Sequence, residues 1–253
     1  MLPATRRRTI AELVSENGGC SVEKLSSELN VSKATIRRDL GELADEELIE
    51  RSHGGAVPIT SVGREQSRQQ RGIQNLPEKA AIAERTVDKM VGEQVVFFDA
   101  GTTTMEVAKR ISSDNVALAA TNSPSIALEL GTEDRDAKLT GGTLRGRTRA
   151  LVGPTAEGFM ERMHFDLLVL GTNAIDTDGL MTPNEDEARM KELMVERSAR
   201  VVLVADHTKL AEQSVVRFAT LEDIDTFVTD REPDETVQRS LENADVTTLL
   251  KKP

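Results

Sequence analysis

Residues 31–57, VSKATIRRDLGELADEELIERSHGGAV, decide how the first part of the chain folds. Within this stretch Ile36, Leu40 and Leu43 recur at i, i+4 and i+7, which is the spacing of one face of a helix. Ser32 stands just before them, where a hydroxyl can cap the first turn. The pattern therefore predicts a helix that begins after Ser32 and buries its aliphatic face.

The same helix gathers positive charge, although the chain has a formal net charge of −11. At about 100° per residue, Arg37 and Arg38 project from the side opposite the aliphatic stripe, and Lys33 and Thr35 flank them near the helix start. For an isolated charge run, a solvated amphipathic helix would be the simpler explanation. Two further helices are predicted before this one, and three helices in this arrangement favour a different explanation. The helix with the cations would lie in the DNA major groove as the second helix of a helix-turn-helix.

Those two helices and a hairpin are predicted from local patterns. TRRRTIAELVSENGG (5–19) has helical apolar spacing and ends at two glycines, and SVEKLSSEL (21–29) begins at a capping serine. LIERSHGGAVP (48–58) has two extended segments around a glycine turn, as a wing would. Arg51 and His53 lie in this hairpin and could contact the sugar-phosphate backbone of DNA. The alternative is a polar turn that only closes the small hydrophobic core.

The string quoted above resembles the winged helix-turn-helix signature of the DeoR family of transcriptional regulators, in which a VS..TIRRDL..L run leads into an R.HGGA wing. The family usually has glycine before the wing, where this chain has Glu46 and Glu47. The resemblance implies that double-stranded operator DNA is a partner. The expected DNA-binding residues are Ser32, Lys33, Thr35, Arg37, Arg38, Arg51 and His53.

Charge is distributed unevenly along the chain. Residues 1–57 hold eight Lys/Arg and ten Asp/Glu, a net charge of −2 that leaves −9 for the remainder. The acidic total argues against nucleic acid, but two basic groups, Arg6–Arg8 and Lys33–Arg38, favour a local positive face. Arginine outnumbers lysine, 22 to 10. Many acids with little lysine indicate a surface adapted to concentrated salt, as in a halophilic archaeon, with ordinary bacterial acidity as the alternative.

Residue usage disfavours several classes of protein. The single cysteine, Cys20, excludes an internal disulfide and suits a reducing compartment. The chain shows no signal-like stretch and no apolar run of membrane-spanning length, so we expect a cytoplasmic protein without a membrane partner. Scattered histidines predict no metal site, and the absence of GxGxxG and Walker A patterns predicts no nucleotide cofactor.

A second pattern begins near residue 79. Short apolar runs alternate there with helix-length segments, as in a parallel sheet covered on both faces. The runs are VVFFD (95–99), VALAAT (116–121), AKLT (137–140), LLVLG (167–171), VVLVA (201–205), TFVT (226–229) and VTTL (246–249). The clearest helix start lies at NEDEARMKELMVERSA (184–199), where Asn184 and Glu187 can form a capping box.

These patterns predict the domain organisation. Residues 59–78 are polar and lack apolar periodicity, so they are the expected linker. We therefore expect a winged helix-turn-helix domain over residues 1–58 and a Rossmann-like parallel α/β domain over residues 79–253.

The loops that leave the predicted strands are alike in composition. They read DAGTTT (99–104), TNSPS (121–125), TGGTLR (140–145), GTNAID (171–176) and DHTK (206–209). Ligands of such folds bind beyond the carboxyl ends of the strands, glycine lets backbone N–H groups approach an anion, and Arg145 and Lys209 can neutralise charge. The composition of any one of these loops is explained by the residues that turns prefer at a strand end. Five together favour a small phosphorylated sugar or polyol as the ligand.

The second half also resembles the DeoR family, on the strings EKAAIAE, FFDAGTTT, TNS, GGTLR, MTPNEDEARMKELM and ADHTK. The resemblance implies a domain similar to ribose-phosphate isomerase that senses a phosphorylated sugar. It also implies that Asp206 accepts hydrogen bonds from sugar hydroxyls and that Lys209 contacts the phosphate. Lys79 and Arg71 are implied to take part in the response to the same effector. The expected effector-binding residues are Lys79, Asp99, Gly101, Thr102, Thr103, Thr104, Gly141, Gly142, Asp206 and Lys209.

The leading hypothesis is a repressor of sugar catabolic genes of the fructose, glucose or glycerol type, released by a phosphorylated sugar intermediate. A homodimer or homotetramer is expected because one recognition helix contacts too few bases. The competing hypothesis is a sugar-phosphate isomerase-like enzyme with an accessory DNA-binding domain, since Asp99, Asp176, Asp178 and Asp206 lie near predicted loops. A third is a winged helix that docks on protein. The winged helix favours the regulator, so no catalytic residue is assigned.

Overall fold

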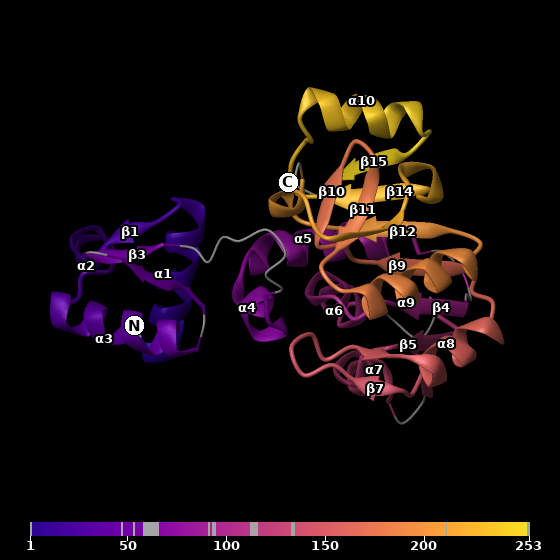
Figure 1. The fold of residues 1–253 in the computed structure, drawn as a ribbon, viewed down its shortest axis with the longest axis horizontal. Helices are drawn as coiled ribbons and strands as arrows, with labels where there is room; N and C mark the ends of the chain where they lie inside the picture. The colour runs from indigo at the N-terminus through magenta and orange to yellow at the C-terminus, as the bar shows by residue number, and fades with distance from the viewer. Residues whose placement is uncertain are drawn as a thin grey trace. The chain divides into compact units, whose positions relative to one another are not determined.

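The computed structural model describes residues 2–46, 48–52, 54–57, 66–90, 92, 95–111, 116–132, 135–210 and 212–251. The chain forms two compact units (Figure 1). The first consists of Met1–Arg64 and Gln69–Asn75, and the second of Glu65–Arg68 and Leu76–Pro253. Each unit has hydrophobic core clusters of its own.

The first unit is a winged helix-turn-helix. Its described elements before the linker are α1 (Pro3–Glu16), β1 (Cys20–Ser21), α2 (Val22–Leu29), α3 (Lys33–Asp45), β2 (Glu50–Ser52) and β3 (Gly55–Val57). The strands pair antiparallel in the order β1-β3-β2, which confirms the predicted hairpin. Ile73 of α4 (Arg68–Ile73) also packs, half-buried, against this core.

Local chemistry explains where these helices begin and end. The Ser21 hydroxyl accepts a hydrogen bond from the Lys24 N–H, and the Ser32 hydroxyl accepts one from the Thr35 N–H, so both predicted caps are confirmed. Asn30 ends α2 in the left-handed region, at a φ of 51°. The predicted aliphatic stripe of α3 is fully buried, and consists of Ile36, Leu40 and Leu43.

The second unit is a parallel α/β domain with additional short strands. Its described helices are α5 (Leu76–Val87), α6 (Thr102–Ala108), α7 (Pro124–Leu130), α8 (Pro154–Glu161), α9 (Glu185–Glu196), η2 (His207–Lys209), η3 (Leu221–Asp223) and α10 (Glu235–Asn243). The strands of its main sheet are β4 (Val95–Phe98), β5 (Leu118–Thr121), β6 (Ala137–Leu139), β9 (Leu167–Leu170), β12 (Val201–Val204), β14 (Thr226–Thr229) and β15 (Thr247–Leu250). Each of these strands lies on one of the predicted apolar runs.

The main sheet is parallel throughout, in the order β15-β14-β12-β9-β4-β5-β6. The chain builds outward from β4 through β5 to β6, and then crosses back to β9 and builds the other way. The order therefore reverses between β4 and β9, which makes the gap beyond their carboxyl ends the topological switch point where such folds bind ligands. The predicted Rossmann-like fold class is confirmed.

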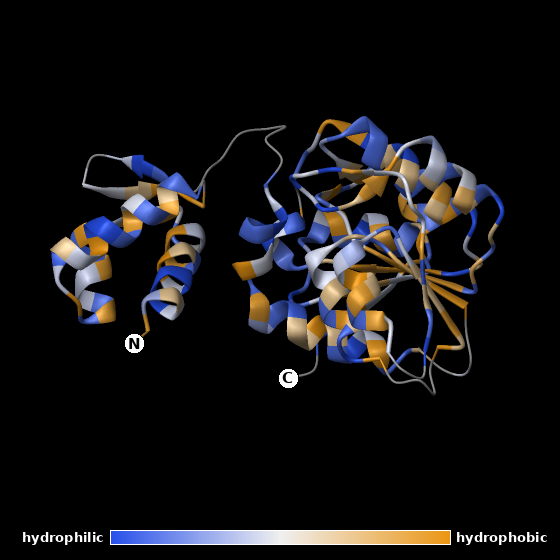
Figure 2. Ribbon diagram, turned by 90° about the horizontal axis from the view of Figure 1, so that it is seen from below, coloured by the Kyte–Doolittle hydropathy of each residue, from blue (hydrophilic) through white to orange (hydrophobic). Residues whose placement is uncertain are grey.

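Successive strand residues serve two separate layers. Phe97 and Leu168 belong to the cluster that packs on α8, α9 and α10, whereas Phe98 and Leu167 belong to the cluster under α5, α6 and α7. Figure 2 shows these strands as hydrophobic along most of their length. Burial on both faces explains why the runs are continuously apolar rather than alternating.

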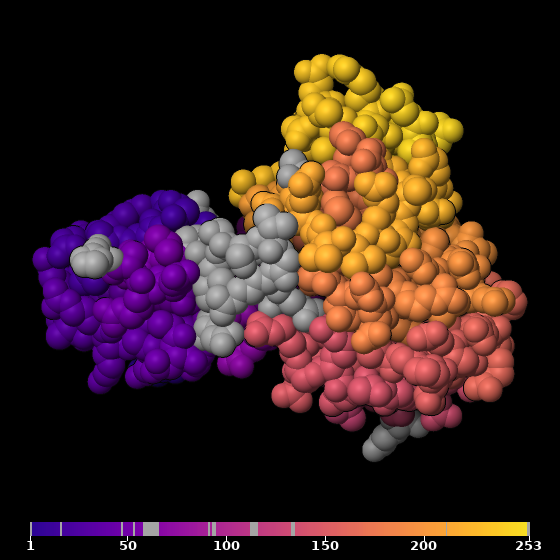
Figure 3. All heavy atoms as spheres, viewed as in Figure 1, coloured from indigo at the N-terminus to yellow at the C-terminus, as the bar shows by residue number. Residues whose placement is uncertain are grey.

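Several elements were not predicted. A second sheet, antiparallel, has the order β10-β11-β13, and a hairpin joins β7 to β8. These strands are β7 (Thr143–Leu144), β8 (Leu151–Val152), β10 (Ala174–Asp176), β11 (Gly179–Thr182) and β13 (Val216–Ala219). The predicted linker also contains α4 and the first turn of α5. Figure 3 shows that the last segments of the chain, in yellow, form one end of the second unit.

Candidate functional site

The outward face of α3 presents two arginines. Arg37 and Arg38 are both exposed, and 68% of the Arg38 side chain is accessible. Arg51 of β2 donates a hydrogen bond to the main-chain oxygen of Arg37 at 3.4 Å, which brings the wing strand and the helix together. Lys33 and Ser32 lie exposed at the start of the same helix. His53 lies outside the described residues.

Glutamates of the same unit accompany these cations. Lys33 Nζ lies 2.8 Å from Glu23 Oε1 of α2, and this hydrogen bond is the main reason why the pKa of Glu23 is lowered. Arg38 Nε lies 4.0 Å from Glu42 Oε1, and Glu42 also pairs with Arg7. Carboxylates of α2 and α3 therefore lie beside the cations of α3 that are predicted to contact DNA.

The RRD triplet of α3 divides between surface and core. Asp39 is 1% exposed and receives two hydrogen bonds from Arg6 of α1, at 2.6 Å from Nε and 3.1 Å from Nη2. The hydrogen bond from Arg6 to Asp39 raises the pKa of Arg6. Arg6 therefore does not contribute to a basic surface patch, contrary to the expectation for Arg6–Arg8. Asp39 shares the inward stripe of Ile36 and Leu40, which is the sequence signal for a buried partner.

In the second unit, a buried ion pair lies at the switch point. Asp99 follows β4 and Gly171 follows β9, and Lys191 of α9 joins the two loops. Lys191 Nζ lies 2.5 Å from Asp99 Oδ2 and 2.8 Å from the Gly171 oxygen, and Asp99 Oδ2 also accepts from the Gly171 N–H at 3.1 Å. The ring centroid of Phe218 lies 5.3 Å from the same Nζ. Sequence reasoning placed Asp99 in the site and missed Lys191.

The predicted phosphate-facing loop, Gly101 to Thr104, begins directly after this pair. The Thr104 hydroxyl is fully buried and donates to the main-chain oxygens of Asp99 and Gly101, at 2.6 and 2.8 Å, so it shapes the loop from inside. The hydroxyls of Thr102 and Thr103 have no partner among the described residues. Thr102 is half-buried and Thr103 is 8% exposed.

The glycine pair after β6 leads into a second internal ion pair. Gly141 and Gly142 both have positive φ, and a Cβ on Gly142 would lie 2.6 Å from the main-chain oxygen of Val152, so the pair allows close backbone packing. Further along, Arg145 Nη1 lies 2.5 Å from Glu187 Oε1, and Glu187 also accepts from the Thr148 hydroxyl.

The other predicted effector residues lie beyond β12. Lys79 of α5 and Asp206 are both buried, with Nζ and Oδ2 3.9 Å apart. Asp206 Oδ1 accepts from the Thr208 N–H at 3.1 Å and caps η2, which ends at Lys209. His207 Nδ1 lies 2.7 Å from Asp230 Oδ2, which ties this loop to the end of β14.

Strand spacing decides which of these residues can meet one small ligand. Neighbouring strands lie about 4.8 Å apart, so the loops after β12 and β6 are separated by roughly 20 Å. The loops after β12 and β4 are separated by roughly 10 Å, with β9 between them. A sugar phosphate can span the shorter distance. Gly141 and Gly142 lie on the far side of β5 from Asp206.

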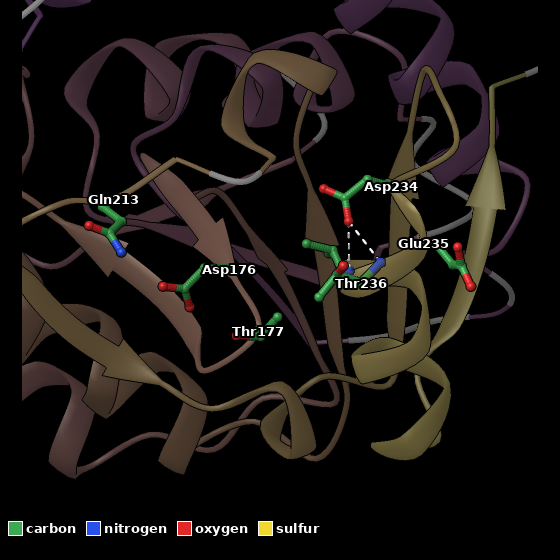
Figure 4. Close-up of a pocket in the computed structure, with 7 residues that line it drawn as sticks. Asp176, Thr177, Gln213, Asp234, Glu235 and Thr236 are labelled. Atoms are coloured by element: carbon green, nitrogen blue, oxygen red, sulfur yellow. Dashed lines mark hydrogen bonds between the residues drawn. The ribbon is translucent and has the colours of Figure 1, made fainter.

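A pocket of about 500 Å³ lies elsewhere in the second unit (Figure 4). It is lined by Asp176, Thr177, Gln213, Asp234, Glu235, Thr236 and Val237. Asp234 accepts hydrogen bonds from the N–H groups of Thr236 and Val237, and so caps α10. The lining contains three carboxylates and no cation, which does not suit a phosphate.

Within the described ranges, every helix is too short or too polar to cross a lipid bilayer.

Family comparisons match both units. The model of the DeoR-like helix-turn-helix domain matches residues 6–62, and that of the DeoR C terminal sensor domain matches residues 74–231. The chain is 63% identical over 250 residues to the HTH-type transcriptional regulator GlpR of Haloferax volcanii, covering 98% of each chain. A relative from a halophilic archaeon is consistent with the salt-adapted surface that the composition of this chain indicates.

Two further comparisons are more distant. The glycerol-3-phosphate regulon repressor of Escherichia coli is 34% identical over 244 residues, covering 95% of this chain and 96% of that one. A solved ribose 5-phosphate isomerase from Plasmodium falciparum is 17% identical, with a TM-score of 0.38, over 53% of this chain and 52% of that one.

Proposed function

We propose that this chain, which belongs to the DeoR family of transcriptional regulators, is a repressor that binds operator DNA through α3 and its wing and is released by a phosphorylated sugar or polyol. The observation that carries the proposal is the division of α3. Its aliphatic face and Asp39 are buried, while Arg37 and Arg38 remain exposed. Arginine forks in this position can bond guanine O6 and N7 or grip phosphates.

The remaining predicted DNA contacts have supporting roles in this proposal. Lys33 and Thr35 at the helix start and Arg51 on the wing strand would contact the sugar-phosphate backbone and fix the register. Ser32 caps α3, so its N–H and hydroxyl lie at the same end of the helix as Lys33 and Thr35. His53 is proposed as a wing contact on the sequence alone.

The effector is proposed to lie between the loops that follow β4 and β12. Lys209 would meet the phosphate from one side, and the Gly101–Thr103 backbone with the hydroxyls of Thr102 and Thr103 would meet it from the other. Asp206 would accept from a hydroxyl, with Lys79 holding that carboxylate in place. The E. coli relative is named for the glycerol-3-phosphate regulon, which makes glycerol 3-phosphate the first effector to test, followed by phosphates of fructose and glucose.

The repressor is proposed to act as a homodimer or homotetramer. One helix contacts only a few base pairs, whereas two helices spaced by one turn of DNA double the contacts and match a two-fold operator. Operator fragments carrying one half-site should therefore bind far more weakly than fragments carrying both.

Regulation rather than catalysis is the proposed role of the second unit. Of the carboxylates near the strand ends, Asp99 pairs with Lys191, Asp206 pairs with Lys79, and Asp178 pairs with Arg217. Asp176 accepts hydrogen bonds from the N–H groups of Asp178 and Gly179. Three of these four carboxylates are held by a cation, and the fourth is held by main-chain N–H groups, which favours a structural or ligand-binding role over that of a general base. Proton NMR of glucose 6-phosphate, fructose 6-phosphate and ribose 5-phosphate incubated with the protein should show no product, and turnover of any of them would favour the isomerase.

The decisive experiment measures operator binding with and without effector. Fluorescence anisotropy with DNA from the promoter of the chain's own gene should show specific binding that a phosphorylated polyol or sugar weakens at least tenfold, which requires about 1.4 kcal/mol of differential affinity between the two states. Inorganic sulfate at equal ionic strength is the control for salt. Binding that no phosphate ester alters would contradict the sensor role.

A further inference from the structure

Among the described residues, one donor and one acceptor at the switch point between β4 and β9 lack oxygen or nitrogen partners. The ammonium of Lys191 has three protons, and the described residues offer it two oxygens, Asp99 Oδ2 and the Gly171 carbonyl. Asp99 Oδ2 accepts twice, whereas Asp99 Oδ1 accepts from no described residue. The ion pair therefore has one N–H and one carboxylate oxygen to offer at the position where folds of this strand order bind ligands.

A hydroxyl group matches this combination. A hydroxyl both donates and accepts, so it can donate to Asp99 Oδ1 while its oxygen accepts from Lys191. A phosphate dianion can only accept, and the Asp99 carboxylate would repel it. A methylene group would leave both the N–H and the oxygen unsatisfied in a nearly dry site, which costs binding free energy.

The pair is built into the fold rather than assembled from mobile side chains. The side chains of Lys191 and Asp99 are 7% and 5% exposed. One helical turn before Lys191, Glu187 fixes α9 through Arg145 and Thr148. Gly171 keeps space beside the carboxylate, because a Cβ there would lie 3.2 Å from Asp99 Oδ2. Both groups have thus already lost the rotamer freedom that ligand binding would otherwise cost.

We propose that Asp99 and Lys191 bind a hydroxyl group of the effector, so that the regulator responds to hydroxylated phosphates and rejects their deoxygenated analogues. A hydroxyl near the phosphate end is the one within reach, since the Gly101–Thr103 loop proposed to face the phosphate begins directly after Asp99. This inference rests on the proposed function, because it assumes a phosphorylated effector.

Matched ligand pairs test the proposal on the full-length chain. Calorimetry would compare glycerol 3-phosphate with 3-hydroxypropyl phosphate, and glucose 6-phosphate with 4-deoxyglucose 6-phosphate, each analogue lacking the free hydroxyl nearest to the phosphate. For the pair that contains the effector, the wild-type protein should prefer the hydroxylated member by roughly 10- to 100-fold, the effect of one hydrogen bond to a charged group.

Variants then test whether Asp99 and Lys191 cause the preference for the hydroxylated ligand. The double variant Asp99→Asn/Lys191→Met removes both charges together and so avoids an unpaired buried charge. It should lose the preference between the two ligands while retaining competition by inorganic phosphate. Arg189→Met removes a cation from the exposed side of the same helix, where Arg189 pairs with Glu192, and should keep the full preference.

The possible failures are distinguishable. If the wild-type chain binds no phosphate ester, the proposed effector class is wrong and this inference falls with it. If the wild type discriminates and the folded double variant discriminates equally, the effector class stands and the role of Asp99 and Lys191 is wrong. Wild-type protein that binds both members of each pair equally would also overturn that role.

Discussion

Exposed ion pairs accompany the recognition helix, whereas buried ion pairs lie at the strand ends of the second unit. Lys33 and Glu23 are 52% and 60% exposed, while Lys191 and Asp99 are 7% and 5% exposed, although the charged atoms in each pair are close. An exposed pair contributes little and exchanges readily with other ions, whereas a buried pair is costly to break. On the proposed function, the first unit would therefore exchange its carboxylates for DNA phosphates, and the second would select a ligand by geometry.

Salt sharpens this difference. At high ionic strength exposed pairs are screened, and buried pairs are screened much less. Contacts between arginine and DNA phosphate weaken with salt as well. Screening of Glu23 and Glu42 would remove part of their competition for the same cations, so we expect these carboxylates to reduce the salt sensitivity of DNA binding.

The largest expected effect comes from breaking the buried pair on one side. Lys191→Ala leaves the Asp99 carboxylate buried without its cation, and should destabilise the second unit by about 3–5 kcal/mol. Urea unfolding followed by circular dichroism measures this. Arg189→Ala on the same helix should change little. A Lys191→Ala protein as stable as the wild type would mean that the pair is not buried in solution.

The next largest effect concerns the exposed arginines. Arg37→Ala should weaken operator binding by about 1–3 kcal/mol and relax sequence preference if Arg37 contacts a base. Anisotropy titrations against the operator and against single-base variants separate these outcomes. Arg8→Ala, which removes a surface cation that pairs with Glu12 on α1, is the matched control. Equal losses in both variants would indicate a general charge effect instead of a specific contact.

A smaller effect is expected from filling the space beside Asp99. Gly171→Ala places a methyl group 3.2 Å from Asp99 Oδ2, and this crowding should weaken effector binding by about 1 kcal/mol, or fivefold. Effector calorimetry provides the measurement. Gly158→Ala on α8 adds a methyl with no heavy atom within 4 Å and should leave affinity unchanged. Tighter binding by the Gly171→Ala protein would contradict the proposed ligand position.

The smallest effect should come from removing a carboxylate on the exposed side. Glu23→Gln frees Lys33 from its partner and should raise affinity for non-specific DNA by no more than a few-fold at low salt, because exposed pairs are weak. The gain should vanish at high salt. Glu12→Gln, on α1, is the control. A large gain that persists in salt would show that Glu23 opposes DNA by a route other than charge.

Local periodicity was sufficient to predict much of the fold. Ile36, Leu40 and Leu43 predict α3 because their spacing repeats within three turns, and VVFF or LLVL predicts a buried strand by composition alone. Strand β13 was missed because it pairs with β11 across more than thirty residues, from Leu180 to Ala219. Strands β10 and β11 form a local hairpin, in which Ala174 pairs with Met181, but residues 174–176 were assigned to a loop. The long-range pairing of β11 with β13 leaves no local repeat in the sequence.

The partners of the buried charged residues could not be predicted from the sequence. Lys191 and Asp99 are 92 positions apart, so only the tertiary fold brings them together. A signal was nevertheless present, because Lys191 falls on the same helical stripe as the buried Met190 and Met194. Glu187 was instead assigned to a capping box. Its N–H does bond to Asn184, but its side chain pairs with Arg145.

The bidentate link between Arg6 and Asp39 has a practical consequence for handling this protein. It joins the beginning of the first helix to the middle of the recognition helix, and so fixes the rotation of the recognition helix about its own axis. A protein trimmed by proteolysis or cloning beyond residue 6 would retain Arg37 and Arg38 but would leave Asp39 buried without its cation, which should destabilise the first unit. Because the second unit has a core of its own, such a truncated protein should still bind effector, yet lose operator binding.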